Sequence, residues 1–228
     1  MRRYALYGVI VEFDHVFICV AEPADEAEQL VDFGLVEGTS NHHPGQGTAN
    51  RRFFFQNAFI EVLFPTDSTE LDNELTGPTN LHERFPPKAH HVSPFGVCFR
   101  PSNSESNVLF ENWSYRPPYL PEHLDVKVAR SPTTEPMWFY LSFGSRPDSV
   151  MDEKRQPLAH QCGFRSITSV KVYTPPVDAF SQPATVLNKS SIVEYIEGKE
   201  HLLVLGFDNE ARGREHDFRP SLPLKFRW

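Results

Sequence analysis

A histidine and a glutamate each interrupt a run of apolar residues in the first third of the chain. His15 lies within Val11–Val20, which is dense in β-branched and aromatic residues, and Glu61 lies within Phe59–Phe64. A carboxylate inside such a run is costly to bury unless it is paired or bound to a metal ion. Imidazole and carboxylate together are suitable ligands for Zn²⁺, Fe²⁺, Mn²⁺ or Ni²⁺. The alternative is that the two side chains face opposite ways, or pair with each other or with an arginine such as Arg51.

A polar, glycine-rich loop at 39–48 carries the second group of candidate residues. Gly45 and Gly47 permit unusual backbone dihedrals and a close backbone approach. Imidazole, hydroxyl and amide groups in and after the loop offer donors and acceptors, at His43, Thr48 and Asn50. The loop is therefore a candidate wall of a ligand pocket, with a plain surface turn as the alternative. It is not a phosphate-binding loop, because it lacks the lysine and the strand-to-helix setting.

Other catalytic patterns are absent from the sequence. There is no Gly-x-Ser-x-Gly elbow, and no Gly-x-Gly-x-x-Gly opens a helix after a strand. Cys19, Cys98 and Cys162 are far apart, without Cys-x-x-Cys spacing, which predicts free thiols in a reducing compartment. The aromatic residues Trp113 and Tyr115, with Tyr119 after them, suit either stacking on a ligand or core packing, and we expect core packing.

The elements that must position these residues are short strands with few helices, since 20 prolines punctuate the chain. The first segment, 9–64, predicts the order β-α-β-β-β. Its helix has Pro23 in the first turn, an apolar face of Ala27, Leu30 and Val31, and Gly34 as its end. Its strands are expected at 11–20, from Leu35, at 50–56 and at 58–64.

The last segment repeats this pattern about 150 residues downstream. Strands are expected at 166–173, 191–196, 201–207 and 222–228. The helix between the first two carries Val177, Phe180, Ala184 and Leu187 on one face, and Pro183 should kink or shorten it.

The middle of the chain is less regular. A long loop is expected at 71–94, strands at 95–100, 124–129 and 137–143, and an ordered aromatic loop at 113–121. A charged linker follows at 144–158. This suggests three parts: 1–94, an N-terminal βαβββ unit with its connecting loop; 95–164, a central β-rich segment; and 165–228, a C-terminal βαβββ unit.

The charge balance restricts the partners. A net charge of −8 and a pI near 5.7 argue against nucleic acid and anionic membranes, which attract basic surfaces. No stretch approaches the 18 or so apolar residues of a membrane span. The basic start at Met1–Tyr4 makes a poor signal peptide, because Glu12 and Asp14 interrupt the apolar run behind it. We therefore expect a cytoplasmic protein.

Three strings of residues resemble a known family. Asp14-His15-Val16 opens a strand, His43-Pro44-Gly45-Gln46-Gly47-Thr48-Ala49-Asn50 forms the loop, and Phe59-Ile60-Glu61-Val62 follows. Together they resemble the glyoxalase-like proteins of the vicinal-oxygen-chelate superfamily, which includes glyoxalase I, extradiol dioxygenases and bleomycin-resistance proteins. The resemblance implies an α+β fold in which repeated βαβββ units form curled mixed sheets around a concave pocket.

The resemblance also implies one divalent metal ion, with ligands from the first and last strands of each unit. His15 and Glu61 occupy those positions in the first unit. The second unit lacks them: Phe95–Val97 holds no histidine, and Tyr140 stands nearest the expected carboxylate. The ligand set is thus incomplete, unless a loop residue such as His43 or His160 completes it.

Two functions remain open. One is a metal-dependent lyase, isomerase or dioxygenase acting on a compound with vicinal oxygens; the other is a metal-free module that binds and sequesters a small molecule. The expected metal ligands are His15 and Glu61, and no catalytic residue is assigned. The expected partner is a small-molecule ligand, with a homodimer as a further option. The expected substrate-binding residues are His43, Gly45, Gly47, Thr48, Asn50 and Tyr140.

Overall fold

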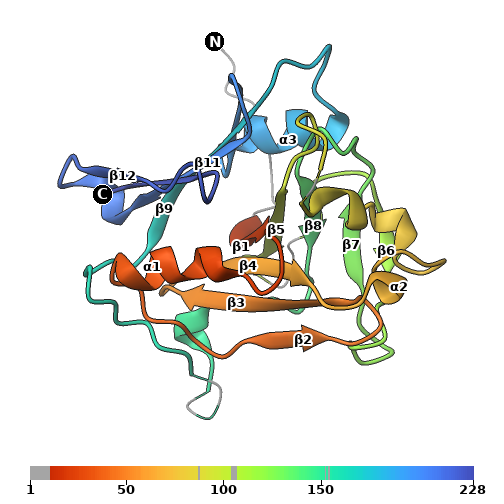
Figure 1. Cartoon of the computed structure of the whole chain (residues 1–228), viewed down its shortest axis with the longest axis horizontal. Helices are drawn as coiled ribbons and strands as arrows, with labels where there is room; N and C mark the ends of the chain where they lie inside the picture. Colours follow the sequence, from red (N-terminus) through yellow and green to blue (C-terminus); the bar gives the residue numbers. More distant parts are fainter. Residues whose placement is uncertain (1–10, 87, 104–106, 152, 154) are drawn as a thin grey trace.

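The structure is a computed structural model that describes residues 11–86, 88–103, 107–151, 153 and 155–228. The basic start of the chain and the first two residues of the 9–64 segment lie outside the described residues. Two open mixed sheets account for most of the regular structure, and the helices are few and short (Figure 1). The predicted α+β class with curled mixed sheets is confirmed. None of the helices in the described residues is long and apolar enough to cross a membrane.

The first half of the eight-stranded sheet comes from the N-terminal segment. A 3-10 turn at Asp25–Ala27 and helix α1 at Glu28–Asp32 follow the first strand. β1 pairs with β4 in parallel, and β4, β3 and β2 follow one another as antiparallel neighbours. The strands are β1 Val11–Cys19, β2 Asn41–His43, β3 Thr48–Phe54 and β4 Phe59–Pro65.

The second half of the same sheet comes from the middle of the chain. β5 pairs with β8 in parallel, as β1 does with β4, and β7 and β6 continue the sheet. The antiparallel pairing of β1 with β5 joins the halves, giving the order β2-β3-β4-β1-β5-β8-β7-β6. The strands are β5 Phe95–Pro101, β6 Asn112–Tyr115, β7 Val126–Ala129 and β8 Met137–Tyr140.

The C-terminal segment forms a separate sheet of five strands in the order β10-β9-β11-β13-β12. Its helix α3, Gln182–Ser190, connects the parallel pair β9 and β10. β9 does not pair with the last strand, which lies beside β11 instead. The strands are β9 Ile167–Thr174, β10 Glu194–Glu197, β11 Leu202–Phe207, β12 Glu215–Asp217 and β13 Leu224–Arg227.

Several local predictions are wrong in detail. Pro23 precedes the first helix instead of opening it, and Val31 is exposed. No strand forms at Leu35; the second strand lies six residues later, inside the segment expected to be a loop. The reason is that Asn41–His43 pairs with the start of β3, so that the glycine-rich segment becomes the turn of a hairpin.

One further prediction is wrong because tertiary pairing decides it. The expected aromatic loop at 113–121 overlaps an edge strand, β6, which pairs with β7.

Pro183 was expected to kink or shorten the helix, and it shortens it. It lies in the first turn of α3, where its missing N–H leaves no bond unmade, and the helix is not kinked there. Val177 and Phe180, expected on the helix, precede it.

The two faces of the eight-stranded sheet have different partners. On β1, Val16 and Ile18 join the large core cluster that also holds Val172 and Leu205 of the C-terminal sheet. The alternate residues Phe17 and Cys19 belong to a second cluster on the opposite face. One face is therefore covered by the C-terminal sheet, while the other face is left to form a concavity.

A buried carboxylate fastens α3 to the eight-stranded sheet. Glu135, fully buried just before β8, accepts hydrogen bonds from the Ser181 backbone N–H at 2.7 Å and hydroxyl at 2.6 Å. It also accepts one from Trp138 Nε1 at 3.1 Å. Ser181 is the N-cap of α3, so this single side chain links the helix to the sheet.

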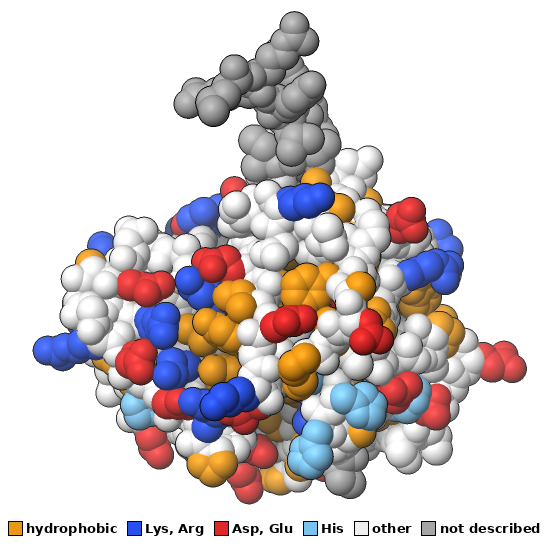
Figure 2. Space-filling model, turned by 90° about the horizontal axis from the view of Figure 1, so that it is seen from above, with side chains coloured by type: hydrophobic (Ala, Val, Ile, Leu, Met, Phe, Trp, Pro, Cys, Tyr) orange, Lys and Arg blue, Asp and Glu red, His pale blue; other side chains and the backbone are white. Residues whose placement is uncertain are grey.

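In the face that Figure 2 shows, acidic and basic side chains are interspersed, and hydrophobic side chains form only small groups between them. The large exposed hydrophobic residues are scattered along the sequence: Val31, Leu75, Phe143 and Met151.

Glu135→Ala should lower the free energy of unfolding by about 3 kcal/mol, because it leaves the buried Trp138 Nε1–H and the two partly buried donors of Ser181 without their acceptor. Chemical denaturation measures the change. Glu122→Ala, at an exposed residue, is the control and should cost less than about 0.5 kcal/mol. Equal losses in the two variants would show that Glu135 does not fasten the helix.

His201 predicts a pH dependence of stability. Its ring Nε2 lies 3.1 Å from the His91 carbonyl oxygen, and burial lowers its pKa to about 4. Between pH 6.5 and about 4 the unfolded chain takes up a proton that the folded protein refuses, so stability should fall as the pH falls through this window. His201→Gln keeps a donor and should flatten the decline in melting temperature. Parallel curves for parent and variant would contradict the assignment.

Candidate functional site

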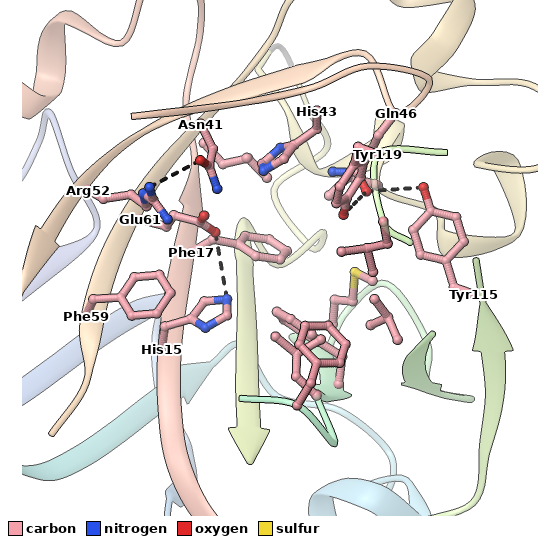
Figure 3. A pocket seen from close by; sticks show the side chains of 18 residues that line it. His15, Phe17, Asn41, His43, Gln46, Arg52, Phe59, Glu61, Tyr115 and Tyr119 are labelled. Atoms are coloured by element: carbon pink, nitrogen blue, oxygen red, sulfur yellow. Dashed lines mark hydrogen bonds and ion pairs between the residues drawn. The ribbon is translucent and has the colours of Figure 1, made fainter. Parts of the chain in front are cut away.

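The concave face of the eight-stranded sheet encloses a pocket of about 300 Å³ (Figure 3). Its two walls differ in chemistry, because they come from the two halves of the sheet. The N-terminal half supplies the polar side chains of His15, Asn41, His43, Gln46, Arg52 and Glu61. The middle segment and its loops supply Leu120, Val126, Met137, Phe139, Leu141 and Phe143, with Tyr115 and Tyr119 beside them.

His15 is held in one orientation by its sequence neighbour. Its ring Nδ1 lies 2.6 Å from Asp14 Oδ1. Because a carboxylate can only accept, Nδ1 carries the hydrogen and the lone pair of Nε2 faces the pocket. The ring stacks on Phe59, with the centroids 4.2 Å apart, and meets the edge of Phe139 from the opposite wall.

Asp14 is in turn fixed by a buried arginine. Arg100 Nη1 lies 3.1 Å from Asp14 Oδ2, while its Nη2 bonds Glu12 and the Asn57 carbonyl, both at 2.8 Å. The pairing of β1 with β5 shifts register between Phe13 and His15, so the strand is irregular at Asp14. Both carboxylate oxygens of Asp14 are thus used behind the pocket, and neither is left for a ligand.

Glu61 of β4 points toward His15 of the neighbouring strand β1 (Figure 3). His15 Nε2 and Glu61 Oε2 are 3.8 Å apart, and Glu61 is buried. The other oxygen, Oε1, accepts a short hydrogen bond from Asn50 Nδ2 on the neighbouring strand. Asn50 Oδ1 accepts from the Asn41 backbone N–H at 2.7 Å, which fixes the orientation of the amide. The sequence prediction that His15 and Glu61 are polar residues directed to one wall therefore agrees with their positions.

The glycine-rich segment is the β2–β3 turn at one end of the pocket. His43 lines the pocket with its Nδ1 2.9 Å from Thr48 Oγ1, and burial lowers its pKa, which favours the neutral ring. Gln46 donates to the same hydroxyl and accepts from the hydroxyls of Tyr115 and Tyr119, at 3.1 and 3.2 Å. Through these hydrogen bonds of Gln46, the turn connects the N-terminal half of the pocket to the middle segment.

The remaining predicted substrate-binding residues lie behind the lining. Gly45 and Gly47 have positive φ and approach other parts of the chain, Thr48 bonds His43, and Asn50 bonds Glu61. Tyr140 is in the large core cluster on the other face of β8, and its neighbour Phe139 lines the pocket instead. Side chains alternate along a strand, so the register of β8 against β5 places Phe139 inward.

The predicted substrate-binding residues did not include three residues that line the pocket: Asn41 and Gln46, which lie in the predicted loop, and Arg52. Arg52 Nη2 donates to Asn41 Oδ1 at 3.2 Å, and its Nε donates to the Thr39 carbonyl at 2.7 Å. For Arg52, the alternation of side chains along a strand could have indicated its position, because it places Arg52 on the same face of β3 as Asn50. Tyr115, expected to pack in the core, is both buried in the second cluster and part of the pocket lining.

His15 Nε2 and Glu61 Oε2 suit a divalent ion. Their separation of 3.8 Å is too long for a hydrogen bond. It is shorter than the about 4.2 Å that two opposed ligand bonds of about 2.1 Å can span. Both side chains also have the outer partners usual for ligands, an acceptor on the imidazole N–H and a donor to the carboxylate.

A second group, Asp14, His15 and Cys98, brings its ligand atoms within 4.8 Å of one another. Its chemistry does not favour a metal ion: the Cys98 thiol donates to the Phe99 carbonyl at 3.5 Å, and only Asp14 and His15 bond each other. Burial raises the pKa of the Cys98 thiol well above its usual value, so the thiol stays protonated. Asp14 already neutralises Arg100 and accepts from His15.

His160 is excluded as a further ligand by its bonds. Its Nδ1 accepts from the Val36 N–H at 2.9 Å, and its Nε2 lies 2.8 Å from the Phe54 carbonyl oxygen. Both ring nitrogens are therefore engaged with backbone outside the pocket lining.

Residues 13–108 match a family described as a glyoxalase-like domain. No curated protein matches the chain. The crystal structure of a hypothetical protein from Staphylococcus aureus is similar over 96% of this chain and 99% of that one, with a TM-score of 0.53 and 14% sequence identity. At this identity the likeness shows the fold alone.

Gly47→Ala should destabilise the protein by about 3 kcal/mol or more, because a Cβ there would lie 2.2 Å from the Asp67 carbonyl oxygen and 2.8 Å from the Leu71 backbone nitrogen. Gly213→Ala is the matched control: its φ is also positive but nothing lies within 4 Å of the added Cβ, so only about 1 kcal/mol is expected. Denaturation curves of both variants separate the two contributions. Equal losses would mean that backbone strain alone requires Gly47.

Proposed function

We propose that the pocket binds a small organic compound through two adjacent oxygens, with a divalent ion held by His15 and Glu61, on the premise that residues 13–108 match the glyoxalase-like domain of the vicinal-oxygen-chelate superfamily. The observation that carries the proposal is that His15 Nε2 and Glu61 Oε2 lie 3.8 Å apart at the pocket. Hydrogen bonds to Asp14 and Asn50 hold the two side chains in these positions. When bound, the ion would polarise the vicinal oxygens of the ligand.

The two walls of the pocket define the rest of the ligand. Arg52 and Asn41 offer donors at the polar wall, and the neutral ring of His43 lies beside them. The apolar wall, with Met137 and Phe139, excludes water and suits an aromatic or aliphatic body. The expected ligand is therefore amphipathic, with its oxygens toward His15 and its carbon skeleton toward β8.

Without a bound ion, His15 is suited to a proton transfer instead, because a lone pair that binds a metal ion cannot also accept a proton. Asp14 accepts from the ring Nδ1–H, so the Nε2 that faces the pocket can take a proton from a bound compound, and Asp14 would stabilise the imidazolium. This is the step of a lyase or isomerase that abstracts a proton next to a carbonyl.

A metal-free binding module is the second candidate. The observation favouring it is the second half of the sheet, where β5 holds no histidine, β8 holds no carboxylate, and the apolar Phe139 of β8 lines the pocket. A site with two protein ligands should hold an ion weakly, since water and ligand oxygens must complete its coordination.

Equilibrium dialysis with Zn²⁺, Mn²⁺, Ni²⁺ and Fe²⁺, on protein without a histidine tag, tests the metal site. One ion should bind, chelator should remove it readily, and His15→Ala or Glu61→Gln should abolish the binding. His42→Ala, at an exposed histidine of the same hairpin, is the control and should leave it intact.

Catechol, which carries vicinal oxygens on an apolar ring, separates the two candidates. Calorimetry with and without chelator should show heat of binding only in the presence of the ion. Binding that persists in chelator and in Glu61→Gln would establish the metal-free module instead.

A further inference from the structure

A second cavity lies beside the pocket, since Met137 lines both. It measures about 350 Å³ and is lined by the loops around Thr79 and Arg130, together with Trp113 of β6. Its charged lining residues, Arg84 and Arg130, are both basic, whereas the first pocket holds Glu61 beside Arg52.

Arg84 is 2% exposed, which is rare for an arginine without a carboxylate partner. Its Nη1 donates to the carbonyls of Ser93 and Glu135, both at 2.8 Å. Its Nε has no hydrogen-bond partner within the described residues. The guanidinium therefore joins two loops through neutral acceptors, and its Nε–H is buried without a partner.

The nearest buried carboxylate does not form an ion pair with Arg84. The carboxylate of Glu135 is occupied by Ser181 and Trp138, and only its backbone carbonyl meets the arginine. Burial lowers the pKa of Arg84 to about 10, which still leaves the side chain charged at neutral pH. Burying a charge without a bonded counter-charge is costly, and an anion in the cavity would reduce that cost.

Arg130 provides a second cation at the rim. It follows the last residue of β7, is exposed, and forms none of the ion pairs found in the described part of the chain. In a chain with a net charge of −8, two arginines around one cavity without an acidic partner are unusual. We propose that this cavity binds an oxyanion, a carboxylate or phosphate group, between Arg84 and Arg130.

The chemistry of the guanidinium supports this choice. Its planar fork bonds carboxylate and phosphate oxygens in pairs, and the hydroxyl and amide groups of Thr79 and Asn80 line the same cavity. The oxyanion can belong to a separate small molecule or to the tail of a compound, and the site stands whether or not a metal binds at His15.

Inorganic phosphate and acetate are the probes, titrated at constant ionic strength with sodium chloride so that general screening is matched. Trp113 borders the cavity and should report binding by a saturable change in fluorescence, which Trp113→Phe should remove while calorimetry still detects binding. Arg130→Ala should weaken binding by about tenfold, since a charge-assisted hydrogen bond is lost. Arg214→Ala removes the same charge from the C-terminal segment and should leave the affinity unchanged.

Arg84→Lys keeps the positive charge but loses the paired N–H donors of the guanidinium, and should also weaken anion binding. If this variant does not fold, the comparison of Arg130→Ala with Arg214→Ala decides the question. Saturable binding of phosphate alone, or of acetate alone, that depends on Arg130 supports the site and identifies the group. The proposal is overturned if neither anion binds saturably to the folded protein, or if Arg130→Ala binds as tightly as Arg214→Ala.

Discussion

The antiparallel pairing of β1 with β5 joins the two halves of the eight-stranded sheet and thereby creates both walls of the pocket. The pairing sets His15 opposite Cys98 and brings Arg100 of β5 to Asp14 of β1. It also requires Gly96, because a Cβ there would lie 2.1 Å from the ring of Phe17. The orientation of His15 thus depends on a contact between segments more than 80 residues apart.

The pocket is asymmetric because the two halves share a strand pattern without sharing polar residues. The first half directs His15 and Glu61 inward, and the second directs Phe139 and Met137 inward. Each polar side chain of the first half has a second partner behind it, Asp14 for the imidazole and Asn50 for the carboxylate. A buried carboxylate and imidazole are tolerable only with such partners, so the polar wall forms one connected network.

The large apolar faces are covered from within the chain. The C-terminal sheet packs on the outer face of the eight-stranded sheet, and Glu135 connects that sheet to α3. The concave face is left open to a ligand because no element of the C-terminal segment reaches it. The residues that pack against the C-terminal sheet and the residues that line the pocket therefore lie on opposite faces of one sheet. Glu135→Ala should mainly lower the free energy of unfolding, and His15→Ala should mainly affect binding in the pocket.

The sequence by itself identified the two central residues of the polar wall. His15 and Glu61 stand out inside apolar strands, since alternation assigns each to a face and burial of a charge demands a partner. Local pattern did not reveal that the middle segment, 95–140, completes the sheet, or that Phe139 and not Tyr140 faces inward. Nor did it reveal that the glycine-rich turn approaches the chain's own backbone at Asp67. These features depend on strand pairing and register between distant segments, which only the tertiary structure decides, because a shift of one residue reverses every side chain of a strand.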